Sequence, residues 1–265
     1  MYLDGKTAII FGGGGAIGGA TAEAMARDGA RVFIAGRTKE RLQAVAGAIR
    51  SAGGSVETDV VDVMDATAVT GYAASVASRT GGIDVALNAT AFLHDQGTPL
   101  SDLTLDTFMT PVDAFLRSLF ITSKAVAPRM GGSRPGVILT LSAPGGKMAA
   151  GGHLGHCVSC AGIEAFSRVL ADEMGPRNVR VICVRPHAIA DAPGAGSYTR
   201  DLFRSKAAAM GLDLDQWLDA AARGTMLGRL PRLAEVAETM AFLASARAGA
   251  MTAAVINLSA GTITD

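Results

Sequence analysis

The sequence predicts a doubly wound α/β fold, in which one parallel sheet of about seven strands carries helices on both faces. Short apolar segments with strand character alternate with longer segments of helical periodicity along nearly the whole chain. Several strand segments are apolar at consecutive positions, as is typical of strands that are covered on both sides. The alternation shows no internal repeat and no second unit, so we expect a single domain over residues 1–265.

The first half of the chain contains four strand segments. Residues 7–11 are apolar and lead into four glycines at positions 12–15. Beyond the glycines, Ile17, Ala20 and Ala24 recur at helical spacing, which predicts a helix. We expect further strands at 31–35, 55–61 and 83–88, and helices at 39–51 and 65–79, each followed by a glycine pair.

The second half continues the alternation with three more strands. A long helical region is expected at 105–130, with Pro111 near its start, where proline is best tolerated. Residues 192–225 interrupt the rhythm, because two glycines are followed by one or two helices rich in alanine and methionine. The remaining expected elements are strands at 137–141, 179–184 and 254–258, and helices at 153–174 and 234–244.

Composition and charge exclude several classes of protein. Hydrophobic residues make up 49% of the chain and charged residues 18%, which argues against disorder. Lys plus Arg and Asp plus Glu number 24 each, so nothing indicates a nucleic-acid or membrane partner. No apolar run is long enough to span a bilayer, and the chain enters its first strand without a signal-peptide pattern. With three cysteines, too few and odd for a disulfide framework, we expect a cytoplasmic protein.

The glycine turn at positions 12–15 predicts a binding site for phosphate. Glycines permit backbone conformations that are closed to other residues, and the helix that follows presents unpaired N–H groups and the positive end of its dipole. The pyrophosphate of a dinucleotide is the usual ligand of such a turn in a Rossmann-like fold. In that fold the ligand binds at the carboxyl ends of the strands, where the strand order reverses.

Four segments together resemble the short-chain dehydrogenase/reductase family. They are FGGGGAIG at 11–18, IDVALNATA at 83–91, NVRVICVRPHAIAD at 178–191, and GRLPRLAEVAETMAFLAS at 228–245, followed by VINLSAG. The resemblance covers nearly the whole chain. It implies a nicotinamide cofactor, a small-molecule substrate, and a homodimer or homotetramer formed through the long helices that begin near residues 105 and 153. On those helices we expect exposed faces carrying Phe115, Leu119, Phe166 and Leu170.

The half of the chain that resembles the family's cofactor site is mostly intact. Gly12 and Gly18 hold the first and third glycine positions, and Ala16 replaces the middle one. The second strand ends at Gly36-Arg37-Thr38, without the carboxylate that reads a ribose hydroxyl, so we expect NADP(H) rather than NAD(H). The expected cofactor-binding residues are Gly12, Gly14, Gly15, Ala16, Ile17, Gly18, Arg37, Thr38, Asp62, Val63, Asn88, Ala89, Pro186 and Ile189.

The catalytic positions depart from the family pattern. The family activates a tyrosine with a lysine four residues later; here the alignment places His156 and Cys160 at these two positions. Ala143 stands at the usual serine, with Ser142 beside it, and Phe115 stands at the usual asparagine. The resemblance therefore implies that the usual proton relay through a phenol and an ammonium group on this helix cannot operate.

All four histidines are expected at the carboxyl edge of the sheet, where a group that titrates near neutral pH can act as an acid or a base. His156 is the first candidate; the alternative is that loops are simply rich in small polar residues. A zinc site along His153, His156, Cys157 and Cys160 is disfavoured, since a straight helix spreads these residues over about 10 Å. We also weigh a Cys157–Cys160 redox pair against plain packing. The candidate catalytic residues are His156, Cys160, Ser142 and His187.

Three functions remain open at this stage. The first is an NADP(H)-dependent oxidoreductase acting on a small, apolar carbonyl, alcohol or enone, with His156 or a water as proton donor. The second is a non-redox acid/base enzyme, such as a lyase, isomerase, dehydratase or cyclase, and the third is a silent cofactor-binding homologue. The segment 192–225 is the expected substrate lid, with an apolar lining of Tyr198, Phe203, Met210, Leu214, Trp217 and Met226.

Overall fold

Seven parallel strands form one sheet in the order β3-β2-β1-β4-β5-β6-β7 in the computed structural model, which describes residues 1–264. The expected fold class is therefore confirmed. The strands are β1 (Thr7–Phe11), β2 (Arg31–Gly36), β3 (Ser55–Val60), β4 (Val85–Asn88), β5 (Gly136–Leu141), β6 (Val179–Pro186) and β7 (Ala254–Leu258).

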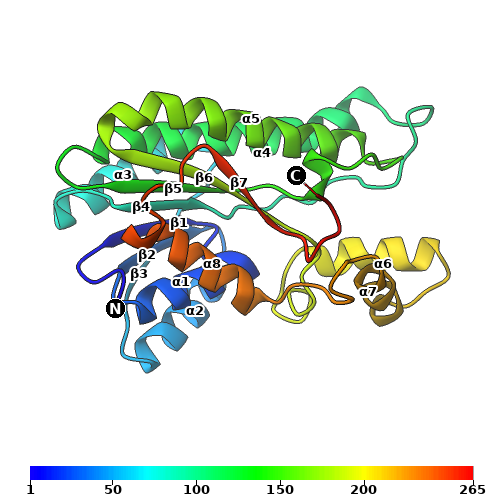
Figure 1. The fold of residues 1–265 in the computed structure, drawn as a ribbon, viewed down its shortest axis with the longest axis horizontal. Coiled ribbons are helices and arrows are strands. Elements are labelled where there is room, and N and C mark those ends of the chain that lie inside the picture. The colour runs from blue at the N-terminus through cyan, green and yellow to red at the C-terminus, as the bar shows by residue number, and fades with distance from the viewer. Residues whose placement is uncertain (265) are drawn as a thin grey trace.

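The strand order reverses at β1, which pairs with β2 on one side and with β4 on the other. At the carboxyl end of β1, Phe11 is in register with Ala35 of β2 and with Asn88 of β4. The connections after β1 and β2 lead to helices on one face of the sheet, whereas the connection after β4 leads to a helix on the other face, so a crevice opens between them (Figure 1). This is the position at which doubly wound sheets bind their ligands.

Helices cover both faces of the sheet (Figure 1). One face carries α1, α2 and α8, and the other carries α3, α4 and α5, while α6 and α7 lie beside the two layers. The helices are α1 (Ala16–Arg27), α2 (Lys39–Ser51), α3 (Ala66–Thr80), α4 (Leu105–Val126), α5 (Leu154–Met174), α6 (Thr199–Ala209), α7 (Leu214–Arg223) and α8 (Leu233–Ala244). None of the helices within residues 1–264 is long and apolar enough to cross a lipid bilayer.

Local sequence signals set several helix boundaries. Asp65 caps α3 by accepting hydrogen bonds from the backbone N–H groups of Thr67 and Ala68. The same helix ends at Gly81, whose φ of 75° lies in the left-handed region that favours glycine. Pro111 lies in the second turn of α4 and packs against Gly155 of α5; a Cβ atom at position 155 would lie 2.7 Å from the Phe108 carbonyl oxygen. Glycine at 155 thus lets these two helices approach closely.

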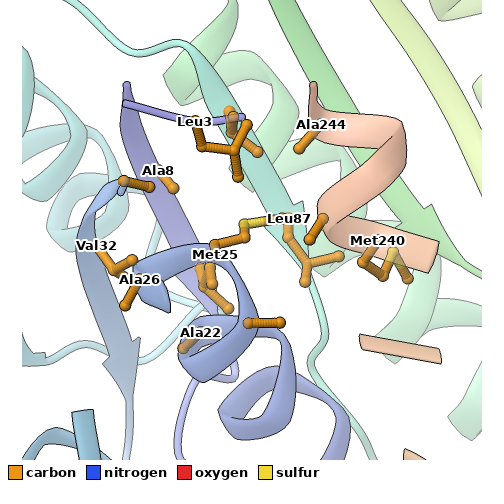
Figure 2. Close-up of a cluster of buried hydrophobic side chains, with 14 of the residues drawn as sticks. Leu3, Ala8, Ala22, Met25, Ala26, Val32, Leu87, Met240 and Ala244 are labelled. Atoms are coloured by element: carbon orange, nitrogen blue, oxygen red, sulfur yellow. The ribbon is translucent and has the colours of Figure 1, made fainter. Parts of the chain in front are cut away.

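Two large apolar clusters fix the layers to the sheet. In the first, shown in Figure 2, Met25 of α1 and Met240 of α8 pack with Leu87 of β4. The second cluster joins α3, α4 and α5 to the opposite face of the same strands. Burial of apolar side chains on both faces explains why the strands of this sheet are continuously apolar.

The expectation of exposed apolar faces on α4 and α5 is wrong for one of its four residues. Leu119, which we expected on an exposed face of α4, is 3% exposed and packs against Ile163 of α5 and Cys183 of β6. Phe115, Phe166 and Leu170 are half-buried. Because α4 and α5 pack against each other and against the sheet, the side chains between them belong to the core of the chain itself.

The segment between β6 and α8 forms the two helices α6 and α7. Phe203 of α6 stacks on Trp217 of α7 with ring centroids 4.5 Å apart, so the two helices hold each other together. Met210 and Met226, which we expected to line a cavity, are 65% and 75% exposed. The apolar lining expected for this segment is therefore wrong for these two methionines, which face solvent.

Candidate active site

A cavity of about 340 Å³ opens at the carboxyl ends of β1, β2 and β4. The glycine turn after β1 forms one wall, and the ends of β2 and β3 form another. The start of the segment leading into α6 closes the third side, through Gly196, Ser197 and Tyr198. Of the expected cofactor residues, those that line this cavity are Gly12, Gly14, Gly15, Ala16, Ile17, Arg37, Thr38, Val63 and Ala89.

The glycine turn is shaped by close backbone approaches. Gly12 has a φ of 79°, and a Cβ atom there would lie 2.5 Å from the Ala89 carbonyl oxygen. A Cβ atom on Gly18 would lie 2.3 Å from the Gly12 carbonyl oxygen, so this glycine lets α1 pack against the turn. The N-cap residue, Gly15, has no side chain to cap α1. The first N–H groups of α1 are therefore available to an anion in the cavity.

Two arginines stand at the far end of the cavity, where β2 ends. Arg37 is exposed there, and Arg41 in the first turn of α2 also lines the cavity. The Nη1 atom of Arg41 donates a hydrogen bond of 3.4 Å to the Gly196 carbonyl oxygen, which links α2 to the segment before α6. Sequence reasoning missed Arg41, because Arg37 precedes α2 and no helical spacing relates the two side chains.

Five expected cofactor residues lie outside the lining. Gly18 and Pro186 are buried, and Asp62 accepts a hydrogen bond from the Met64 backbone N–H. Asn88 donates to the Thr122 hydroxyl and accepts from the Thr90 backbone N–H, so it positions the loop after β4. Ile189 packs against Ala16 and Ile17 in a small apolar cluster. Gly18, Asn88, Pro186 and Ile189 thus support the cavity from behind its surface, whereas Asp62 is exposed.

His94 and His156 meet next to this cavity. His94 follows β4 and His156 lies in the first turn of α5; their rings stack with centroids 5.1 Å apart. His94 Nε2 lies 3.0 Å from His156 Nδ1. Gly145 makes room for the second ring, because a Cβ atom there would lie 2.9 Å from His156 Cδ2.

Hydrogen bonding assigns the protons on these two rings. His94 Nδ1 lies 2.7 Å from the Phe92 carbonyl oxygen, which only accepts, so this nitrogen carries the proton. Neutral His94 therefore accepts at Nε2, and His156 donates to it from Nδ1. The lone pair of His156 is then on Nε2, which lies 3.7 Å from the Cys160 sulfur. Both nitrogens of His156 are engaged.

The pKa values of the pair keep both rings neutral. Burial, together with the neighbouring His94, lowers the pKa of His156 to about 3. Burial also lowers the pKa of His94. For Cys160, burial raises the pKa to about 12, and it raises the pKa of Cys157 as well. Neither thiol is activated as a redox pair would require, and both are free.

Lys206 of α6 reaches into the same cluster. Its ammonium group donates to the Gln96 side-chain carbonyl oxygen and lies 2.9 Å from His153 Nε2. Gln96 in turn donates from Nε2 to His94 Nε2 at 3.0 Å. Burial lowers the pKa of Lys206 to about 8. Sequence reasoning missed Lys206, because nothing local shows which side of α6 faces the sheet.

Ser142 belongs to a separate buried group. Its hydroxyl donates a hydrogen bond of 2.9 Å to Glu164 Oε1. Glu164 also receives two hydrogen bonds from Arg185, of 2.7 Å from Nε and 2.9 Å from Nη2, and both charged side chains are buried. The serine hydroxyl is thus committed to the Glu164 carboxylate.

His187 and Tyr198 complete the surroundings of the cluster. Burial and the charge of Lys206 lower the pKa of His187, whose ring makes no hydrogen bond within residues 1–264. Tyr198 lines the cavity and lies against His94, with ring centroids 6.4 Å apart. Burial raises the pKa of Tyr198 to about 12, so its phenol is protonated at neutral pH. Within the described part of the chain, no group of three or more His, Cys, Asp or Glu residues is arranged to hold a metal ion.

A doubly wound parallel sheet whose switch point opens into a glycine-lined cavity defines a dinucleotide-binding α/β protein. The chain belongs to the short-chain dehydrogenase/reductase family, an oxidoreductase family whose members use nicotinamide cofactors. Its residues 14–262 match the family model described as enoyl-(acyl carrier protein) reductase.

Relatives and solved structures agree with this assignment. The chain is 30% identical to the short-chain reductase protein NovJ of Streptomyces niveus over 97% of its own length and 93% of the relative's. It is 30% identical to galactitol 2-dehydrogenase of Rhizobium johnstonii, with coverage of 98% and 95%. A short-chain dehydrogenase/reductase structure from Serratia marcescens superimposes with a TM-score of 0.84 at 26% identity, covering 99% of each chain.

Proposed function

We propose that this protein is an NADP(H)-dependent oxidoreductase that interconverts a carbonyl compound and an alcohol. The observation that carries the proposal is the pair Arg37 and Arg41 at the end of β2, on the wall of the cavity. Two guanidinium groups at this place suit the additional phosphate of NADP(H), because arginine binds phosphate through paired N–H donors. The second strand offers no carboxylate there to bind a ribose hydroxyl.

The residues of the cavity fit a dinucleotide from end to end. The uncapped first turn of α1 suits the pyrophosphate, and Val61 and Val63 supply an apolar surface for the adenine. The opposite end of the cavity, at Thr90 and Tyr198, adjoins the histidine cluster and suits the nicotinamide. When bound, the cofactor supplies or accepts the hydride, and the protein must supply or accept a proton.

Two side chains compete for the proton, and the geometry favours Tyr198. His156 stands at the position of the family's tyrosine, with Cys160 at that of its lysine, and is the first candidate that the sequence predicts. Its ring is neutral, however, and both nitrogens are engaged by His94 and Cys160. The Tyr198 hydroxyl makes no hydrogen bond within residues 1–264, and its side chain lines the cavity. We therefore assign the role of proton donor to Tyr198. His156 instead holds the ring of His94 in place through their hydrogen bond.

The second candidate function is acid/base catalysis without redox chemistry. The observation that favours it is the neutral His94–His156 pair at the active-site rim, since paired imidazoles can exchange a proton. A lyase, isomerase, dehydratase or cyclase of this kind would work without turnover of a nicotinamide. A silent cofactor-binding homologue would bind the nucleotide and turn over nothing.

Titration of the purified protein with NADPH and with NADH tests the proposal, with nucleotide fluorescence and calorimetric heat as readouts. We expect NADPH to bind more tightly than NADH by about 10–100-fold, as charge-assisted hydrogen bonds to one phosphate predict. Failure of both nucleotides to bind would refute the oxidoreductase proposal and favour acid/base chemistry. Tight binding without consumption of NADPH across a broad panel of carbonyl compounds would indicate the silent homologue.

A further inference from the structure

Lys206 is a half-buried cation whose hydrogen-bond partners are both neutral. Its ammonium group bonds to the Gln96 side-chain carbonyl oxygen and to His153 Nε2. His153 Nδ1 lies 2.7 Å from the Gly151 carbonyl oxygen, so that nitrogen carries the proton and Nε2 accepts from Lys206. Gln96 in the loop after β4 and His153 at the N-terminus of α5 thus bind the charged side chain of Lys206 from α6.

No carboxylate neutralises this charge within residues 1–264. None of the ion pairs in that part of the chain includes Lys206. Asp95, the acidic neighbour of His94, accepts hydrogen bonds from Thr98. By contrast, the buried Arg185 is paired with Glu164. A cation withdrawn from water without a counterion is costly, so its retention next to an active-site cavity points to an anionic ligand.

The surroundings of Lys206 can complete an anion site. The ammonium group has three N–H donors and uses two of them, which leaves one. His187 follows β6, and its ring makes no hydrogen bond within residues 1–264, so its N–H is available as a donor; burial and the charge of Lys206 both lower its pKa. Two remaining donors match the two oxygens of a carboxylate, whereas a phosphate group presents three or more oxygens to satisfy.

We propose that Lys206 and His187 bind the carboxylate of the substrate, so that the substrate pair is an oxo acid and its hydroxy acid. The inference rests on the proposed oxidoreductase function and replaces the apolar substrate expected from the sequence. Because Lys206 lies on α6, the carboxylate that it binds also holds this helix against the active site. Cavity-lining Tyr198 immediately precedes the same helix, so binding of the acid and placement of the phenol are linked.

Trp217 provides a readout that needs no turnover. It is the only tryptophan of the chain and stacks on Phe203, which lies on the same helix as Lys206. Occupation of the Lys206 site is therefore expected to change the intrinsic fluorescence of the protein. With NADP⁺ in place of NADPH, an oxo acid cannot be reduced, and the complex is stable during the measurement.

The experiment compares matched ligands on the protein saturated with NADP⁺. Short 2-oxo and 3-oxo acids are titrated while Trp217 fluorescence is followed, with butan-2-one as the match for 2-oxobutanoate. Inorganic phosphate is the third probe. We expect saturable binding of at least one acid, about 10–100-fold tighter than its ketone, because the acid alone makes charge-assisted hydrogen bonds.

Two variants make the result specific. The Lys206→Gln variant should bind the acid no more tightly than its ketone, while its NADPH affinity and melting temperature stay close to those of the wild type. Lys147→Gln removes an exposed cation after β5 and should change nothing. Equal binding of acid and ketone, no binding of any acid, tighter binding of phosphate, or an unaffected Lys206→Gln variant would each overturn the proposal.

The same titrations separate this inference from the proposed function. NADPH affinity is measured on the same samples before any acid is added, and the acids are also titrated without nucleotide. If the nucleotide fails to bind, the oxidoreductase proposal fails on that measurement alone. If the nucleotide binds and the acids do not, only the assignment of the carboxylate site is wrong.

Discussion

His94 Nε2 lies 3.0 Å from His156 Nδ1, and this contact joins the loop after β4 to the first turn of α5. The bond holds only while His94 is neutral, because its other nitrogen is committed to the Phe92 carbonyl oxygen. Proton uptake by His156 would bring a charge beside Lys206, whose own charge already lowers the pKa of this ring. The pair is therefore built to remain neutral.

Stability is expected to fall as the pH drops below the ordinary histidine pKa. The pKa of His156 is about 3 in the folded chain, against a value of 6.5 without the fold. Between these values the unfolded chain binds the extra proton, so unfolding is favoured as pH falls. The contribution is complete above pH 6.5 and lost towards pH 3.

Melting temperatures measured across this range check the prediction. His156→Gln should flatten the pH dependence, and Lys147→Gln, which changes an exposed group, should leave the wild-type slope. His94 and His187 add to the slope in the same direction, because burial lowers their pKa values too. An identical slope in the wild type and His156→Gln would show that His156 is not the neutral buried group inferred here.

Tyr198→Phe is expected to reduce turnover by about 10²–10⁴-fold while NADPH affinity is kept, since the variant loses only the proposed proton donor. Tyr72 is the matched control, because its hydroxyl is buried without a hydrogen-bond partner within residues 1–264 and is distant in sequence from residues 192–225. Tyr72→Phe should retain full activity. Steady-state rates with an accepted substrate, together with nucleotide titrations, measure both effects. A larger loss in His156→Phe than in Tyr198→Phe would return the donor role to His156.

Removal of either cavity arginine should weaken NADPH binding selectively. Arg37→Ala and Arg41→Ala are each expected to cost about tenfold or more for NADPH and little for NADH, which lacks the additional phosphate. Lys39→Ala, which removes an exposed cation at the start of α2, is the control and should affect neither nucleotide. Equal losses for the two nucleotides would mean that the guanidinium groups do not read the phosphate.

The elements of the sheet were predictable because their signals are local. Strands Thr7–Phe11 and Ala254–Leu258 and helix Lys39–Ser51 have the bounds expected from apolar periodicity and from the glycines that follow them. The glycine turn was predictable for the same reason. Gly12 and Gly18 stand where a side chain would collide with the Ala89 and Gly12 carbonyl oxygens.

The candidate site was only partly predictable, because it depends on contacts between distant segments. Lys206 meets Gln96 across 110 residues and His153 across 53, and nothing local fixes how α6 docks. Met210 and Met226 looked equally suited to a cavity, yet packing of α6 and α7 through Phe203 and Trp217 turns them to solvent. Local patterns identify the helices of this segment but not the faces that they bury.

Exposed apolar side chains on α4 and α5 predict self-association through these helices. Phe120 is 53% exposed and Val169 is 61% exposed. Both are more exposed than the four residues expected on these faces, of which Leu119 is buried and the other three are half-buried. Sedimentation is expected to give a homodimer or homotetramer. Phe120→Glu with Val169→Glu should shift the mass towards 26.9 kDa, whereas Met226→Glu, at an exposed position after α7, should not. A wild-type monomer would rule the association out.

The buried Glu164–Arg185 pair should dominate the stability of the region behind the active site. Glu164→Gln removes the charged acceptor of two hydrogen bonds from Arg185 and is expected to cost about 3–5 kcal/mol, as is usual when one charge of a buried pair is removed. The Ser142 hydroxyl loses its charged acceptor in the same variant. Glu238→Gln is the control, because Glu238 pairs with Arg27 on the surface, where such pairs contribute about 1 kcal/mol or less. Denaturant unfolding of both variants measures the difference, and equal losses would show that the charge of Glu164 does not stabilise the fold more than that of Glu238.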